Sequence, residues 1–229
     1  PLRVLQTQKT LKLSSNLTKN KMYKGITLSA SIMCIDWLKL SKQLEELKEN
    51  EIDYLHFDVI DGYFAPDFTM GSSIINLIRE NTSIKSDFHI MADEPSRLFN
   101  SFDISKEDYY TIHQEACRNL HRDIVYVKKN MAKVGVALSP GTSTETLEYL
   151  LEEIDMVILM TVNPGYMGQQ MVPQVLKKID KVRELREKYG LKFKISVDGN
   201  VSLDNIKNMI KSGADTLVLG SSGLFRKDR

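Results

Sequence analysis

The sequence predicts one α/β domain with the (β/α)8 architecture of a TIM barrel, and two observations carry that prediction. From Thr27 onward, eight short apolar runs alternate with longer segments of helical period. This alternation is typical of repeated βα units around a parallel sheet. No G-x-G-x-x-G motif follows the first run, so the competing architecture, a doubly wound dinucleotide-binding sheet, loses its main support.

Each expected strand is a short run dominated by β-branched, aromatic and other apolar residues. The eight runs are Thr27–Met33, Tyr54–Val59, Lys85–Met91, Tyr109–His113, Lys133–Leu138, Met156–Val162, Lys192–Asp198 and Thr216–Ser221. Between them, apolar residues recur at spacings of three and four, which predicts helices that include residues 40–50, 143–154, 173–190 and 202–213. Ser202 and Gly213 supply start and stop signals for the last of these helices.

Domain organisation follows from the same pattern. Residues 26–229 are expected to form one barrel domain without an internal boundary. Only GLFRKDR follows the last strand, so the eighth outer helix is expected either to be missing or to lie outside this sequence. Residues 1–25 form a separate arm with six basic residues and no acidic one. This arm lacks the apolar core of a secretory signal and the Arg bias of transit segments, which favours a flexible or loosely helical arm over a targeting segment.

Composition and charge exclude several classes of protein. Thirty-one Lys and Arg residues against thirty Asp and Glu residues leave a formal charge of +1, which is too balanced for a nucleic-acid binder. No apolar run approaches the roughly 18 residues needed to cross a bilayer, so no membrane association is expected. Cys34 and Cys117 have neither metal-finger spacing nor a disulfide-rich setting, which predicts reduced thiols and a cytoplasmic location.

Polar side chains gather at the predicted carboxyl ends of the strands, where the active sites of parallel barrels lie. His56 and Asp58 are two residues apart, so both point to one face of the second strand. His89 and Asp198 end the third and seventh strands. The four residues predict a site for one divalent metal ion, with mixed N and O ligands that suit Zn, Mn, Fe or Co better than Ca. A hydrogen-bonded structural pair is the alternative for His56 and Asp58, and His113 is expected to contact either the metal ligands or the substrate.

Three glycine-containing loops form a second group. They are NPGYMG at residues 163–168, DGN at 198–200 and GSSG at 220–223. Glycine allows backbone N–H groups to approach an anion closely, and the loops after the seventh and eighth barrel strands are a frequent phosphate site. Tight βα turns would explain any one of these loops, but the three together predict phosphate binding.

Several long motifs, in register from Leu28 to Phe225, resemble the ribulose-phosphate 3-epimerase family. They are SASIMCID, HFDVIDGYFAPDFT, DFHIM, MTVNPGYMGQ, SVDGN and GSSGLF. The resemblance implies a metal-dependent isomerase that interconverts D-ribulose 5-phosphate and D-xylulose 5-phosphate, and it implies a homodimer or larger homo-oligomer. Its implied partner is a small ketose phosphate, and no redox cofactor is called for.

The resemblance also implies roles for individual residues. His56, Asp58, His89 and Asp198 would bind the metal, and Asp58 and Asp198 would be the two acid/base carboxylates. The residues that would contact substrate are Ser31, Met91, Met160 and His113. Those that would hold the phosphate are Gly165, Gly168, Gly199, Asn200, Gly220 and Ser221. Two opposed bases are needed because inverting a carbon beside a ketone removes a proton from one face and returns one to the other.

Departures from the family pattern bear on the substrate. Ile60 replaces a methionine, Tyr63 a histidine, Asp67 an asparagine and Asn200 a glycine, and none of these changes removes a proposed ligand. The combination of MCID and GSSGLF is more similar to the D-allulose 6-phosphate 3-epimerase branch, so a hexulose phosphate is the alternative substrate.

Other functions for a barrel receive less support. A Schiff-base aldolase would need a lysine on the sixth strand, and MVILMTV has none. A barrel decarboxylase or hexulose-phosphate synthase would show an Asp-x-Lys-x-x-Asp array, whereas HFDVIDG carries no lysine. A non-catalytic sugar-phosphate binding barrel, or an interaction role for the basic arm, stays open at this level.

Overall fold

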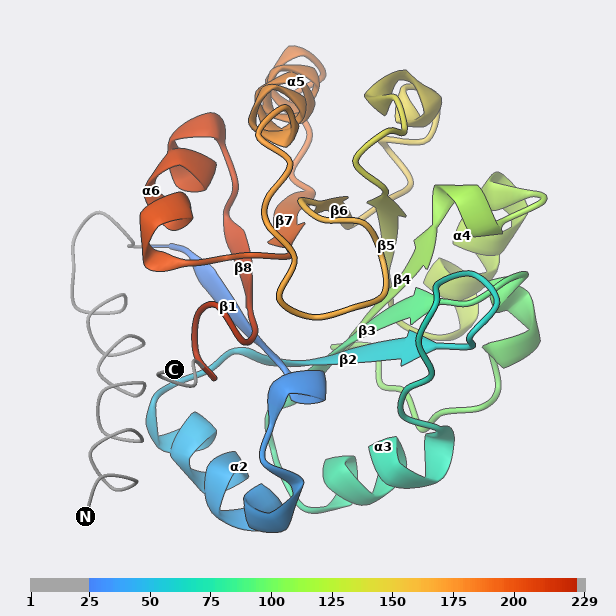
Figure 1. The fold of residues 1–229 in the computed structure, drawn as a ribbon. Helices are drawn as coiled ribbons and strands as arrows, with labels where there is room; N and C mark the ends of the chain where they lie inside the picture. Colours follow the sequence, from blue (N-terminus) through green and yellow to red (C-terminus); the bar gives the residue numbers. More distant parts are fainter. Residues whose placement is uncertain (1–24, 226–229) are drawn as a thin grey trace.

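The computed structural model describes residues 25–225, and these form a closed eight-stranded barrel (Figure 1). The strands follow the chain order β1 to β8, all neighbouring pairs are parallel, and β8 pairs with β1. They are β1 (Thr27–Ser31), β2 (Tyr54–Ile60), β3 (Lys85–Met91), β4 (Tyr109–His113), β5 (Lys133–Leu138), β6 (Met156–Met160), β7 (Lys194–Asp198) and β8 (Thr216–Leu219). The predicted (β/α)8 fold is confirmed.

The helices lie outside the barrel, between consecutive strands (Figure 1). The α-helices are α2 (Leu40–Glu49), α3 (Ser72–Glu80), α4 (Leu120–Asn130), α5 (Val175–Lys188) and α6 (Leu203–Ser212). Short 3₁₀ helices are η2 (Ile32–Cys34), η3 (Trp37–Lys39), η4 (Pro95–Leu98), η5 (Gln114–Ala116) and η6 (Thr144–Leu147). The stop and start signals of α6 are as predicted: the Ser202 hydroxyl accepts the Asn205 N–H, and Gly213 adopts φ 118°.

The helix predicted over residues 143–154 is wrong. This segment contains only η6, followed by turns whose hydrogen bonds join residues three apart, such as Leu150 N to Leu147 O at 2.8 Å. Ser143 and Thr146 make local hydrogen bonds that compete with the α-helical pattern. Leu147 and Leu151 are still buried, because a spacing of three to four residues also suits successive 3₁₀ turns.

Two predictions concern the ends of the chain. After β8 the described residues form only a turn up to Phe225, so no outer helix follows β8 within residues 25–225. The N-terminal arm lies outside the described residues except for Gly25, and its conformation and the domain boundary stay predictions. No helix within the described range is long and apolar enough to span a membrane.

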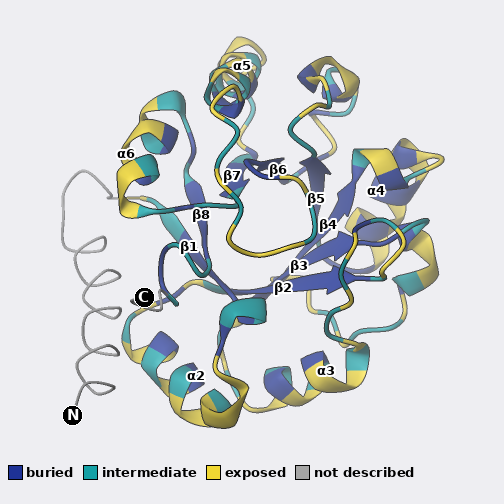
Figure 2. Cartoon of the chain, in the orientation of Figure 1, coloured by how far each residue is buried: buried dark blue, intermediate teal, exposed yellow. Residues whose placement is uncertain are grey.

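Burial divides the barrel wall into an outer and an inner face. The outward-facing side chains of the strands join the buried faces of the helices in the main apolar core, while the outer helix faces are exposed (Figure 2). Inside the barrel, a smaller apolar cluster comes chiefly from β6, with Met156, Ile158 and Met160, and also includes Tyr109 of β4 and Ala137 of β5. Buried polar residues on β1 to β4 and β7, among them His56 and Asp87, fill the rest of the interior. The polar part of the interior leads to the C-terminal end of the barrel, described next.

The opposite, N-terminal end of the barrel carries a repeated structural feature. An aspartate stands immediately before each even-numbered strand and accepts a backbone N–H from the odd-numbered strand that precedes it. The four pairs are Asp53 with Leu28 N at 2.8 Å, Asp108 with Ser86 N at 2.8 Å, Asp155 with Val134 N at 2.9 Å and Asp215 with Ile195 N at 3.0 Å. These carboxylates join neighbouring strands where the ladder begins.

Candidate active site and metal centre

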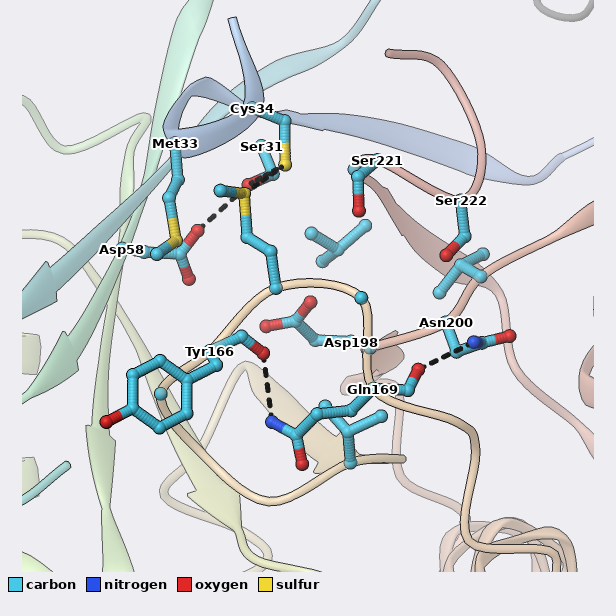
Figure 3. Close-up of a pocket in the computed structure, with 18 of the residues that line it drawn as sticks. Ser31, Met33, Cys34, Asp58, Tyr166, Gln169, Asp198, Asn200, Ser221 and Ser222 are labelled. Atoms are coloured by element: carbon cyan, nitrogen blue, oxygen red, sulfur yellow. Dashed lines mark hydrogen bonds between the residues drawn. The ribbon is translucent and has the colours of Figure 1, made fainter. Parts of the chain in front are cut away.

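A pocket opens at the C-terminal ends of the strands, as expected for a parallel barrel. Its walls come from the ends of β1, β2, β3, β6, β7 and β8 and from the loops that follow most of these strands. Figure 3 shows the Asp58 and Asp198 carboxylates in this pocket, reaching it from different strands. Tyr166 and Gln169, from the loop after β6, lie beside them.

Four side chains meet at the floor of this pocket. His56 Nε2 lies 3.2 Å from Asp58 Oδ1 and 3.5 Å from Asp198 Oδ2. His89 Nδ1 lies 3.3 Å from Asp58 Oδ1 and 3.4 Å from Asp198 Oδ2. The two imidazole nitrogens are 3.3 Å apart, and all four atoms lie within 4.8 Å of one another. The structure therefore brings together all four residues that the sequence predicted as ligands.

This spacing fits a metal ion. In a regular tetrahedron with metal–ligand bonds of about 2.0–2.2 Å, the ligand atoms are about 3.3–3.6 Å apart. The five separations given above run from 3.2 to 3.5 Å. Two nitrogen and two carboxylate donors suit Zn, Mn, Fe or Co, so the cluster can hold one such divalent ion.

Charges within the cluster stabilise one another. Burial disfavours the charged form of each group, but the neighbouring charges outweigh it. Burial lowers the pKa of His56, but the carboxylates of Asp87 and Asp58 outweigh this effect and raise that pKa well above its usual value. Burial likewise opposes the change at His89, whose pKa is raised by hydrogen bonds to Asp198 and Asp58. The pKa values of Asp58 and Asp198 are lowered, against burial, chiefly by the two imidazoles, so both carboxylates are ionised.

Asp87 is a partner of the four-residue cluster that the sequence interpretation missed. Its Oδ2 lies 2.7 Å from His56 Nδ1 and accepts the Ser29 hydroxyl at 3.1 Å. A carboxylate on the remote imidazole nitrogen fixes the tautomer of a metal-binding histidine and raises its basicity. One signal was available: Asp87 is two residues before His89, so both face the barrel interior.

His113 lies beneath the pocket rather than on its lining. Its Nε2 is 2.9 Å from His89 Nε2, and its Nδ1 is 3.0 Å from Glu115 Oε2. Burial lowers the pKa of His113 to about 4 despite Glu115, so the ring is neutral. Although burial opposes it, hydrogen bonds from His113 and Thr142 lower the pKa of Glu115 to about 2.

Ser31 both lines the pocket and holds one of the carboxylates. Its hydroxyl donates to Asp58 Oδ2 at 2.9 Å, while Asp58 Oδ1 faces the imidazoles. Met91 and Met160 also line the pocket. Met33 and Cys34 join them there, two lining residues to which the sequence interpretation assigned no site role. Burial, reinforced by Asp58, raises the pKa of Cys34 to about 11, so it remains a neutral thiol.

All residues predicted to hold the phosphate line the same pocket. They are Gly165, Gly168, Gly199, Asn200, Gly220 and Ser221. Gly199 needs to be glycine, because its φ is 103° and a Cβ there would lie 2.4 Å from a Val162 methyl. Asn200 also has a positive φ, 45°, and its amide donates to Gln169 O at 2.7 Å, which joins the loops after β6 and β7 (Figure 3).

Comparison with known proteins agrees with this geometry. Residues 27–225 match the model of the Ribulose-phosphate 3 epimerase family. The chain belongs to this family. Its curated relatives include ribulose-phosphate 3-epimerase of Bacillus subtilis (strain 168), 36% identical over 205 residues that cover 89% of this chain and 94% of that protein. The chloroplastic ribulose-5-phosphate-3-epimerase of Arabidopsis thaliana is 35% identical over 205 residues that cover 89% of this chain and 73% of that protein.

Family membership confirms the predicted enzyme class, an isomerase of the ribulose-phosphate 3-epimerase type. Solved structures with low sequence identity show the fold alone. Thiamine phosphate pyrophosphorylase from Pyrococcus furiosus has a TM-score of 0.57 at 12% identity, covering 89% of this chain and 90% of that one. A tryptophan synthase complex from the same organism has a TM-score of 0.57 at 13% identity, covering 86% of this chain and 88% of that one. The roles assigned to single residues stay predictions.

Proposed function

We propose that this epimerase-family chain interconverts D-ribulose 5-phosphate and D-xylulose 5-phosphate by two-base proton transfer, with one divalent metal ion (Zn, Mn, Fe or Co). One observation carries the proposal. Asp58 on β2 and Asp198 on β7 approach the same two imidazoles from separate strands, and both carboxylates line the pocket. The pocket also contains the glycine loops expected for a phosphate.

The two carboxylates have complementary roles in this reaction. One takes the proton from C3 of the ketose, which leaves a planar enediolate, and the other returns a proton to the opposite face. In the reverse direction the two exchange roles, which suits a reversible epimerisation. Because the pKa values of both carboxylates are lowered, the acid that returns a proton must first take one up from water, while the other stays ionised and accepts the proton from C3. Each turnover leaves the protonation states of the two carboxylates exchanged. A bound divalent ion would supply Lewis-acid stabilisation of the negative charge that develops on the sugar oxygens.

Other residues bind and orient the sugar phosphate. Ser31 holds Asp58 through Oδ2, so the carboxylate keeps its direction during proton transfer. Met91 and Met160 offer polarizable apolar contacts beside the reacting carbons. The backbone amides of the three glycine loops would bind the phosphate. The sequence predicts this role for six residues of these loops.

D-Allulose 6-phosphate is the second candidate substrate. Cys34 of MCID and Ser221 of GSSGLF both line the pocket. The two segments that resemble the allulose-phosphate branch therefore lie where they would contact substrate. A six-carbon ketose phosphate would undergo the same C3 chemistry with the same two carboxylates.

A single comparison tests the proposal. The purified full chain is stripped with a chelator, reloaded with one metal at a time, and assayed with D-ribulose 5-phosphate and D-allulose 6-phosphate in deuterated water. We expect metal-dependent turnover and deuterium incorporation at C3, with the pentulose phosphate preferred. Preference for the hexulose phosphate would select the second candidate. Absence of C3 exchange from both sugars in metal-loaded protein would indicate a non-catalytic binding barrel.

Assembly and location belong to the same proposal. We expect a homodimer or larger homo-oligomer in the cytoplasm, as the family resemblance and the two free thiols suggest. Sedimentation of the full chain measures the first expectation, and a monomer at micromolar concentration would refute it.

A further inference from the structure

We propose that Glu115 and His113 are positioning residues that fix the tautomer of His89 and thereby aim its Nδ1 lone pair into the four-residue cluster. The inference rests on the metal site of the proposed function, but not on the identity of the sugar. It assigns His113 to the support of a ligand instead of to substrate contact.

Hydrogen-bond geometry at His89 carries the first step. One ring nitrogen, Nδ1, faces Asp58 and Asp198 at 3.3 and 3.4 Å, and the other, Nε2, lies 2.9 Å from His113 Nε2. The planes of the two rings are inclined by only 25°, and the nitrogens are much closer together than the ring centroids, which are 5.0 Å apart. This is the arrangement of a hydrogen bond between facing ring edges, so one nitrogen donates and the other accepts.

Proton counting decides the direction of that bond. A neutral imidazole that offers a lone pair on Nδ1 carries its proton on Nε2. His89 then donates to His113 Nε2, and His113 carries its own proton on Nδ1, where it donates to Glu115 Oε2 at 3.0 Å. In the reverse arrangement, a lone pair of His113 would face the carboxylate and His89 would direct an N–H into the cluster. The carboxylate of Glu115 therefore selects the tautomer that binds metal.

Glu115 is itself held in place by the segment after β5. Its Oε1 accepts the backbone N–H of Ser139 at 2.8 Å and the hydroxyl of Thr142. This leaves Oε2 for His113, whose side chain is completely buried. Lys178 from α5 donates to Ser139 O at 2.6 Å and braces the same segment. The chain of contacts thus runs from a fixed loop through Glu115 and His113 to His89.

The two imidazoles of the cluster are oriented independently. His56 has its own carboxylate, Asp87, at 2.7 Å from Nδ1, whereas His89 reaches a carboxylate only through a second histidine. Removal of the Glu115–His113 pair should therefore disturb one ligand and spare the other. That asymmetry makes the inference testable by variants that leave the catalytic carboxylates intact.

The wild-type chain provides a direct test. The full chain, labelled with ¹⁵N-histidine and loaded with Zn²⁺ in the absence of sugar phosphate, is studied by long-range ¹H–¹⁵N correlation spectra. We expect His89 to be protonated on Nε2 and His113 on Nδ1, both neutral. A proton on Nε2 of His113, or an imidazolium at His113 in the loaded protein, would overturn the proposal.

Variants supply the second test, read out as metal affinity by chelator competition and as the visible spectrum of the Co²⁺-loaded protein. His113→Leu removes the acceptor and should weaken metal binding about 10- to 100-fold, the usual cost of losing such a partner. His113→Gln restores an acceptor and should recover most of the lost metal affinity. Glu115→Gln should have a metal affinity between those of wild type and His113→Leu. The matched control Thr146→Val removes a nearby hydroxyl that donates to Ser143 O and not to Glu115, so its metal affinity should equal that of wild type.

The outcomes separate this inference from the proposed function. If His113→Leu is folded and retains wild-type metal affinity, the positioning role is wrong. If the variants at saturating metal show a raised KM for the sugar phosphate with unchanged metal affinity, His113 contacts substrate instead. A wild-type chain that binds metal but epimerises neither sugar refutes the proposed function alone, because both tests use metal without substrate. A wild-type chain that binds no metal refutes both.

Discussion

The two ends of this barrel use aspartate in opposite ways. At the N-terminal end, Asp53, Asp108, Asp155 and Asp215 each accept a backbone N–H from a neighbouring strand. At the C-terminal end, among the described residues, the carboxylates of Asp58 and Asp198 receive no backbone hydrogen bond. Their partners are the two imidazoles, with the Ser31 hydroxyl added for Asp58. Acids fixed by the backbone stabilise the sheet, whereas acids that face titratable side chains remain available for proton transfer.

This difference follows from the direction of the strands. A residue just before a strand lies beside the first amides of its neighbour, which need acceptors at the edge of the ladder. A residue at the end of a parallel barrel strand faces the mouth, where loops and ligands meet. The same residue type therefore acquires a structural role at one end and a chemical role at the other.

The largest effect that tests this comparison is the loss of one of the two proposed acid/base carboxylates. Asp58→Asn and Asp198→Asn should each lower kcat by about 10²- to 10⁴-fold, because an amide cannot exchange the C3 proton. Thermal unfolding of the metal-free protein should also shift to lower temperature, because each substitution removes a carboxylate whose pKa is lowered by the two imidazoles, so kcat is measured per folded molecule. Asp155→Asn, at the other end, is the control: its amide oxygen can still accept the Val134 N–H, so full activity is expected. Near-normal turnover in either active-site variant would contradict the two-base mechanism.

The next effect concerns stability at the N-terminal end. Asp108→Ala should lower the free energy of unfolding by about 3 kcal/mol, because a buried carboxylate that serves several donors is lost. Asp108 accepts Ser86 N, Ser105 N and Arg79 Nη2, each at 2.8 Å. Urea unfolding measures the loss, and kcat per folded molecule should be unchanged.

Asp53→Ala is the matched comparison for that experiment. Asp53 is exposed and, within residues 25–225, accepts only the Leu28 N–H, so its removal should cost about 1 kcal/mol. Equal losses for the two variants would mean that burial and the number of donors do not set the contribution of these aspartates. A fall in kcat for Asp108→Ala would mean that the two ends of the barrel are coupled.

Sequence reasoning identified the four residues of the cluster better than the residues that orient them. His56, Asp58, His89 and Asp198 could be found because strand alternation fixes which side chains share a face, and parallel strands bring their carboxyl ends to one side. The partnership of His56 with Asp87 depends on the register of β2 against β3, in which the two are direct neighbours. Register is a tertiary property, and neither strand reveals it alone.

Two other features that the sequence did not predict have a similar cause. The periodicity of residues 143–154 is compatible with both 3₁₀ and α-helical turns, and local side-chain hydrogen bonds decided between them. His113 was recognised as belonging to the catalytic end, but the direction of its ring depends on Glu115, which is held by the segment after the next strand. Residue types and strand positions therefore predicted the members of the site, whereas the orientation of each member required the packed structure.

The smallest effect sharpens the contrast between the two proposed acid/base carboxylates themselves. Ser31→Ala removes the hydroxyl that donates to Asp58 Oδ2 at 2.9 Å, and no such donor to Asp198 exists among residues 25–225. Loss of one hydrogen bond to a charged group costs about 1.5 kcal/mol, which corresponds to roughly a tenfold fall in turnover. Ser196→Ala, which removes a buried hydroxyl that has no partner in the described part of the chain, is the control and should stay near wild type. Because only Asp58 loses a partner, the primary isotope effect with C3-deuterated sugar should rise for one epimer and not for the other. Equal changes for both epimers would show that Ser31 acts on the substrate and not on Asp58.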